Sequence, residues 1–438
     1  IMKPVKTKFF LIIPFFITLT YILDFYVLDS LSSQQFWCVE IYREFSFLNF
    51  NNLRLPIHCD EGPYRFASES LSNFFDETNP YQGRPLFILS ISIFRNIFNI
   101  LSFINISEYL IFRIAMLFIQ FIVLFFIIRI FVSLTNLDFQ SKTDYLIIFL
   151  VISTPSIRWN IFFSSVENLT FLLFLLSLKY LLSDQENSTR KNSAFILLGV
   201  LSLAHMSAIV YGFIILLFEK INKKEIKFSL LIKRIFYLLV FQVMYRLTVY
   251  FSDYSFYDWH KEIYNQFYWI FDVIQGKPPI AECQTLNTFW KCNILVTGSF
   301  LGYFLMLMLY LVSIVLVSLY FKENVPELIK YSFFVNLFIF FFWSLQGLYE
   351  PFRFVNYSIG YFLFFSLFIY TTMYKKNLYL TLSILIFQFS VIYLEPYNTA
   401  LNIPQVNVLT IISVLFFLVF LTQFSLKKQK ENNFTKYN

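Results

Sequence analysis

Long apolar runs recur along the whole chain, and each is about long enough to cross a membrane as a helix. A helix needs about 20 mostly apolar residues to cross the hydrocarbon core. The composition agrees, because 58% of the 438 residues are hydrophobic and only 14% are charged. Such runs predict about twelve spans, at 9–28, 85–104, 110–134, 145–161, 166–182, 194–218, 235–251, 295–320, 332–348, 354–374, 378–394 and 407–426.

The sequence therefore predicts an all-α fold, a polytopic transmembrane helical bundle that forms one domain over residues 1–438. Helices are expected because lipid offers no partner to unpaired backbone groups. The composition excludes a soluble enzyme and a disordered chain. No Gly-rich phosphate loop or Walker-type lysine occurs, so no nucleotide cofactor is expected. We attribute the net charge of +7 to cytoplasmic anchors and expect no nucleic-acid partner.

Clusters of lysine and arginine predict the orientation, since cytoplasmic loops of membrane proteins are enriched in these residues. With twelve spans, all four clusters of the chain fall on one side; they lie at 3–8, 220–234, 375–376 and 427–430. We predict a multi-pass protein of the plasma (inner) membrane, with both termini and the tail 427–438 in the cytoplasm. The basic start and apolar run of residues 1–28 are expected to form an uncleaved first span.

Two long, net acidic loops are predicted to face outward, at residues 30–84 and 252–294. All of the cysteines lie in these loops, and they are Cys38, Cys59, Cys283 and Cys292. That distribution suits an oxidising compartment, in which each loop could close one disulfide. Free thiols are the other interpretation, because spacing alone does not decide connectivity.

The first outer loop, residues 30–84, is the richest in side chains that could do chemistry. Asp60 and Glu61 are adjacent carboxylates, and apolar residues follow at helical spacing, among them Tyr64 and Leu71. This spacing predicts a helix over 63–75 that lies along the membrane surface and begins beside the two carboxylates. Carboxylates near a helix start are also ordinary capping groups, so a structural role stays open.

The loop resembles those of the GT-C superfamily, multi-spanning glycosyltransferases that use polyprenyl-phosphate-linked sugars. Their plan is a first span, an outer loop with an Asp-Glu-x-x-Tyr-like motif, a surface helix, and a Pro-Leu start of the second span. The corresponding residues here are Asp60-Glu61-Gly62-Pro63-Tyr64 and Arg84-Pro85-Leu86. The resemblance covers about residues 9–218, and it also includes Thr154-Pro155, Glu167 and Leu198–Leu203.

The resemblance implies transfer of a sugar from a polyprenyl-phosphate-linked donor in the bilayer to a cell-surface glycan or lipid acceptor. Such transfer needs a base for the acceptor proton and positive charge to hold the departing phosphate. We expect Asp60 to be the base and Glu61 to assist it or to hold a divalent metal. The candidate substrate-binding residues are Tyr64, Arg65, Arg84, Glu350, Arg353 and His205.

One departure from the family concerns the second carboxylate that several of its branches use on the outer face. Glu167 holds the corresponding place in the sequence, but the predicted spans put it nearer the cytoplasmic side. Either the span count before Glu167 is off by one, or Glu167 is not catalytic. Three further arginines, Arg95, Arg113 and Arg129, lie within or near apolar spans. Because charge in lipid is costly, we expect them to face the bundle, a cavity or an interface. The alternative is that those at span ends snorkel, extending their long side chains to the membrane surface.

Other functions stay open. The segment His205-Met206-Ser207-Ala208, with Ile157-Arg158, also resembles EpsG-like and Wzy-like exopolysaccharide or O-antigen polymerases. A buried structural histidine is the simpler interpretation of His205. Arg353 could equally be an interfacial anchor or pair with Glu350. A transporter or flippase for a lipid-linked glycan also suits about twelve spans, although the chain lacks the two related halves that transporters often show. A non-catalytic scaffold subunit is a further alternative.

Overall fold

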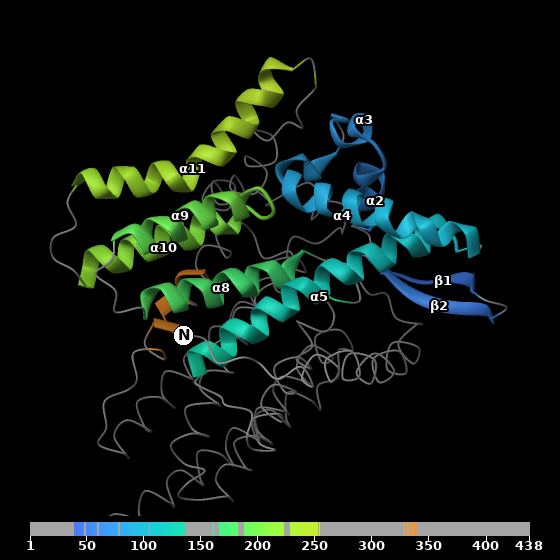
Figure 1. Ribbon diagram of the computed structural model, residues 1–438, viewed down its shortest axis with the longest axis horizontal. Coiled ribbons are helices and arrows are strands. Elements are labelled where there is room, and N and C mark those ends of the chain that lie inside the picture. The colour runs from blue at the N-terminus through green and yellow to red at the C-terminus, as the bar shows by residue number, and fades with distance from the viewer. Residues whose placement is uncertain are drawn as a thin grey trace, which may run out of the picture.

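In the computed structural model, most described residues lie in helices, and one antiparallel hairpin precedes them (Figure 1). The structure describes residues 39–47, 50–58, 61–77, 79–104, 106–135, 161, 166–182, 188–222, 228–252, 254, 328, 331–332, 334–335 and 337–339. Its elements are β1 (Val39–Phe47), β2 (Phe50–His58), α2 (Glu61–Glu69), α3 (Leu71–Phe74), η1 (Pro80–Gly83), α4 (Pro85–Phe98), η2 (Asn99–Ile104), α5 (Glu108–Thr135), α8 (Glu167–Leu181), α9 (Ser188–Ser202), α10 (Ser207–Asn222) and α11 (Phe228–Phe251).

Three of the described helical segments are long and apolar enough to cross a membrane: Pro85–Phe103, Glu108–Leu134 and Phe228–Phe251. Two shorter apolar helices, Asn168–Leu181 and Asn192–Ser202, accompany them. These helices support the prediction of a helical membrane protein. Most of the predicted spans after residue 254 lie outside the described residues, so the total of about twelve stays a prediction.

The loop at residues 30–84, predicted to face outward, contains a β-hairpin, which the all-α prediction did not include. β1 and β2 pair antiparallel, with Val39 opposite His58 and Phe47 opposite Phe50. A signal for β2 was present in the sequence, because Leu53, Leu55 and Ile57 alternate with polar residues or proline. Alternation with a period of two is typical of a strand. The hairpin leads directly into the segment that carries Asp60 and Glu61.

Residues 194–218 were predicted as one span, but they form parts of two antiparallel helices, α9 and α10, joined by a turn at 203–206 (Figure 1). Phe195 lies in the middle of α9, and the centre of its ring is 5.6 Å from that of Tyr180. Glu219 lies near the end of α10 and accepts a 3.1 Å hydrogen bond from the same tyrosine hydroxyl. The turn at 203–206 is too short to bring the chain back to the start of α9, so the two helices run in opposite directions and Tyr180 contacts both.

Polar side chains explain why the helix ends where α9 meets the turn. The Ser202 hydroxyl donates to the Gly199 carbonyl at 2.6 Å, and the Ser207 N–H donates to Nδ1 of His205 at 3.3 Å. Such local bonds offer the backbone an alternative to helical hydrogen bonds. The sequence prediction missed this turn because apolar residues flank these polar side chains on both sides.

The contacts define two ends of the bundle. The Glu219 end is where Tyr180, Glu219 and Arg234 meet, and the His205 end is the opposite one, at the turn 203–206. Since Tyr180 lies near the end of α8, that helix begins at the His205 end.

α5 and α8 run in the same direction along the bundle. Asn168, near the start of α8, donates to Gln120 of α5 at 3.0 Å, while Lys179, near the end of α8, lies close enough to Arg129 of α5 for the two like charges to repel each other. Across the two pairs, the residue nearer the end of α8 is matched by the residue nearer the end of α5. α5 therefore begins at the His205 end, as α8 does.

α4 begins at this end as well. The Leu86 N–H donates to the Leu203 carbonyl at 3.0 Å, and the Tyr245 hydroxyl donates to the Gln82 carbonyl at 2.8 Å. The chain from Leu86 to Glu108 thus starts and finishes at the His205 end. A span at 85–104 followed by one at 110–134 would have placed the start of α5 at the Glu219 end instead.

α11 packs closely against α9 and α10 at two glycines. A Cβ on Gly199 would clash with the carbonyl oxygen of Tyr237, and one on Gly212 would lie 2.6 Å from the Leu238 side chain. Small residues allow helices in a membrane to approach this closely. Gln242 of α11 then donates to the Ser202 carbonyl at 2.7 Å, which fixes the end of α9.

Substitution of Gly199 tests this packing. We expect Gly199→Ala to lower the stability of the full-length protein in detergent by about 1–3 kcal/mol, because the new methyl group meets backbone that cannot rotate away. Gly212→Ala should cost less, since the Leu238 side chain can move. Gly62→Ala is the control, because nothing lies within 4 Å of a Cβ there. Equal thermal stability of the Gly199 and Gly62 variants would contradict the close approach of α9 and α11.

Candidate functional site

The structure describes some of the predicted site residues and not others. Those described are Glu61, Tyr64, Arg65, Arg84 and His205. Asp60, Glu350 and Arg353 lie outside the described residues, as do all four cysteines, and their predicted roles stay predictions.

The helix predicted over 63–75 is confirmed in its first part, as α2. Tyr64 and Ala67 are buried, as the helical spacing predicted, but Leu71 is 61% exposed. The reason is that α2 ends before Leu71, and Ser70 starts the separate helix α3 by accepting a 3.1 Å hydrogen bond from the Asn73 N–H. A serine at this position is a common N-cap, and the new helix places Leu71 outside the buried face.

Glu61 is the most deeply buried acidic residue of α2, with 1% of its surface exposed. Arg113 of α5 donates to its Oε1, and the Tyr109 hydroxyl donates to its Oε2 at 2.5 Å. We name these three side chains the Glu61 cluster. A buried charge is tolerated only when it is paired and hydrogen-bonded. The cluster therefore anchors the first residue of α2 to the first two turns of α5.

The expectation that Arg113 faces the bundle is confirmed, but Tyr109 was not predicted to take part. A usable signal existed, because Tyr109 and Arg113 are four residues apart and so share one face of a helix. Glu61 was predicted to assist a base or to hold a metal. Both of its carboxylate oxygens accept hydrogen bonds within the cluster, which fits a positioning role. Among the residues that the structure describes, no group of three or more His, Cys, Asp or Glu could hold a metal ion.

Two predicted substrate-binding residues meet directly. Arg84, at the start of α4, donates to the hydroxyl of Tyr64, and its guanidinium lies 5.3 Å from the centre of the Tyr81 ring. The Tyr64 and Tyr81 rings are 4.2 Å apart. The ring of Phe87 in α4 packs against that of Tyr64 edge to face, with 5.4 Å between the ring centres. Aromatic packing and a cation–π contact thus hold Arg84 where α2 meets α4.

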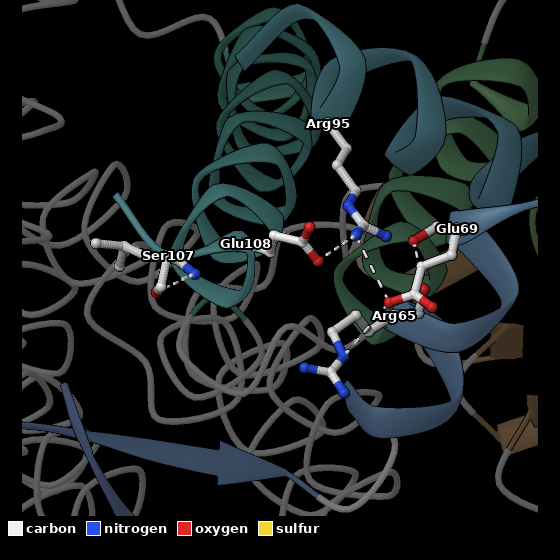
Figure 2. Close-up of polar contacts among 7 residues, drawn as sticks. Arg65, Glu69, Arg95, Ser107 and Glu108 are labelled. Carbon is white, nitrogen blue, oxygen red and sulfur yellow. Dashed lines mark hydrogen bonds and ion pairs between the residues drawn. The ribbon is translucent and has the colours of Figure 1, made fainter. Parts of the chain in front are cut away.

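Arg65 belongs to a second, more open set of charges (Figure 2). Its Nε lies 3.8 Å from Oε1 of Glu69, and the same carboxylate oxygen lies 3.5 Å from Nη2 of Arg95. That nitrogen is also 3.6 Å from Oε2 of Glu108, at the start of α5. With 38% of its side chain exposed, Arg65 can meet an anion from solution at a modest desolvation cost. Exposed pairs of this kind add little stability.

His205 lies at the same end of the bundle, in the turn that Leu86 contacts. It is buried, and its Nδ1 lies 2.7 Å from the Ser207 hydroxyl. These contacts support the structural interpretation of His205, since the ring closes the turn between α9 and α10. A role in binding substrate stays a prediction.

The structure also corrects the predicted side of Glu167. α8 begins at Glu167, at the His205 end, whereas Lys220 and Lys233 lie at the Glu219 end with their neighbours Glu219 and Arg234. The predicted spans had placed Glu167 on the side of those lysines. Within the described helices, Glu167 and those lysines therefore lie at opposite ends, and a catalytic role of Glu167 stays a prediction. Glu167 shares an end with α2, although its side chain is outside the described part.

Comparison with known proteins finds no matching family model, no similar curated protein and no similar solved structure.

Removal of Glu61 tests the anchoring of α2. We expect Glu61→Ala to destabilise the full-length protein by about 3–5 kcal/mol, because Arg113 would remain buried without its main partner. The measurement is thermal unfolding in detergent, together with the amount of protein in membranes. Glu77→Ala, which removes an exposed carboxylate nearby, should change neither. A double variant, Glu61→Leu with Arg113→Leu, should regain part of the lost stability. If Glu61→Ala unfolds no earlier than Glu77→Ala, the cluster does not anchor α2.

Proposed function

We propose that the protein is a membrane glycosyltransferase that moves a sugar from a polyprenyl-phosphate-linked donor to a glycan or lipid acceptor. The observation that carries the proposal is the Glu61 cluster, because it fixes the start of α2 at the residue that directly follows Asp60 in the chain. A catalytic base must be held in a defined place beside the acceptor, and rigid elements provide this better than free loops.

The distribution of charge supports a reaction at the His205 end, on the outer face of the membrane. Lys220 and Lys233 lie at the Glu219 end, and the sequence between them includes the basic stretch of residues 223–227. The positive-inside rule favours a cytoplasmic location for that end. α2 and the start of α8 then face outward, with both termini cytoplasmic. A lipid-linked donor presented at the outer surface suits this orientation and needs no nucleotide fold.

The chemistry divides among the residues as follows. Asp60 takes the proton of the acceptor hydroxyl as that oxygen bonds to the anomeric carbon, and the polyprenyl phosphate departs with the electrons of the broken bond. Arg65 and Arg84 provide positive charge near the start of α2 for the departing phosphate. A carboxylate also stabilises the oxocarbenium-like transition state. Glu61 positions α2 and does not take the proton.

The decisive variant is Asp60→Asn, which keeps the size of the side chain and removes the proton acceptor. We expect transfer of labelled sugar from a polyprenyl-phosphate donor in membranes to fall by about 10²–10⁴-fold, the usual effect of lost acid–base catalysis. Glu77→Gln, a change of the same kind at an exposed residue of the loop, is the matched control and should keep full transfer.

The contrasting variant is His205→Ala, which should reduce the amount of folded protein because the turn loses its buried partner. Rates are therefore normalised to protein in the membrane. Normal transfer by Asp60→Asn, together with an inactive but well-folded His205→Ala, would reject Asp60 as the base and favour a polymerase-like enzyme.

A further inference from the structure

α4 and η2 expose a continuous stripe of large apolar side chains. Its members are Leu89, Ile93, Ile97, Ile100 and Phe103, which are 56%, 48%, 56%, 68% and 76% exposed. They follow one another at intervals of four or three residues, so they share one face of the helix. A row of this length is larger than the scattered apolar residues of an ordinary protein surface and indicates an interaction surface. We name it the α4 stripe.

The opposite face of α4 packs against the protein. Phe87, Ile88 and Ile91 are buried in the core that α4 shares with α2 and α5. Arg95, also directed toward this side, is held between Glu69 and Glu108 (Figure 2). α4 therefore has one face fixed by packing and ion pairs and another that is apolar and uncovered. A helix of this kind is suited to lie in a membrane interface.

The path of the chain excludes a full crossing by this segment. Leu86 contacts Leu203 at the His205 end, and α5, which follows η2, begins at the same end and runs toward the Glu219 end. Length and composition alone would allow Pro85–Phe103 to span. The contacts instead bring the chain back to its starting side before α5 begins.

We infer that α4 and η2 lie within a single leaflet, the one at the His205 end, with the α4 stripe against its acyl chains. The choice of lipid as the occupant rests on continuity with α5. That helix exposes its own row of apolar residues, Phe118, Ile122 and Phe126, along a segment long enough to span. The two rows belong to neighbouring helices in one hairpin, and the second must face lipid if α5 crosses. This inference is independent of the proposed enzymatic activity.

The arrangement explains the corrected position of Glu167. In this arrangement, residues 85–104 do not cross the membrane and residues 194–218 cross it twice. The total number of predicted crossings therefore stays even. Residues between these two segments then change sides, and the termini keep theirs.

Accessibility of Ser107 tests the side on which α5 begins. Full-length protein with its four native cysteines changed to serine would carry Ser107→Cys, Ser72→Cys or Lys220→Cys, all at exposed residues. An impermeant maleimide is added to intact cells and, separately, to lysed cells. We expect Ser107→Cys to label under the same condition as Ser72→Cys, next to α2, and Lys220→Cys under the other condition. Labelling of Ser107→Cys together with Lys220→Cys would show that α4 crosses and would overturn the inference.

Photocrosslinking tests the occupant and leaves the native cysteines in place. Benzoylphenylalanine at Ile97, on the α4 stripe, is illuminated in native membranes and the products are analysed by mass spectrometry. We expect phospholipid adducts at Ile97 and crosslinks within the chain at Ile91, which is fully buried. Crosslinks from Ile97 to a second copy or to another protein, without lipid adducts, would overturn the assignment of lipid.

Discussion

The burial of one carboxylate organises the whole His205 end of this protein. Glu61 has almost no contact with solvent, so its charge is compatible with folding only because Arg113 and Tyr109 reach it from α5. That requirement sets the position of α2 on α5. The positions of Tyr64 and Arg84, and with them the start of α4, depend in turn on α2. A single electrostatic constraint thus contributes to where several of the polar residues of the loop at residues 30–84 lie.

The sequence predicted those features that depend on local pattern. Apolar runs identified a helical membrane protein, and helical spacing identified the helix that begins near Asp60, including the burial of Tyr64. The cost of charge in lipid correctly placed Arg113 against the bundle. The sequence could not identify Glu61 as the partner of Arg113, because the two residues are 52 positions apart and only the folded chain brings them together.

The differences between the predicted spans and the structure share a physical cause. Hydropathy shows which residues are apolar but not where the chain turns back. Residues 194–218 are apolar enough for one span, and a few polar side chains around His205 suffice to turn the helix back on itself. Residues 85–104 are also apolar, but ion pairs of Arg95 hold them beside α2. Under the inference that α4 stays in one leaflet, the two differences cancel in the parity of the crossings, and residues between the two segments, Glu167 among them, change sides.

The short lengths of α9 and α10 have a consequence for the surrounding bilayer. With 15 and 16 residues, they reach about 22–24 Å along their axes, less than the roughly 30 Å of a typical hydrocarbon core. Either the lipid thins locally around this hairpin, or the polar turn at His205 stays below the headgroups. If α9 and α10 cross the membrane, the hydrophobic mismatch falls beside α2, and membrane thickness becomes a variable that acts on this end of the protein.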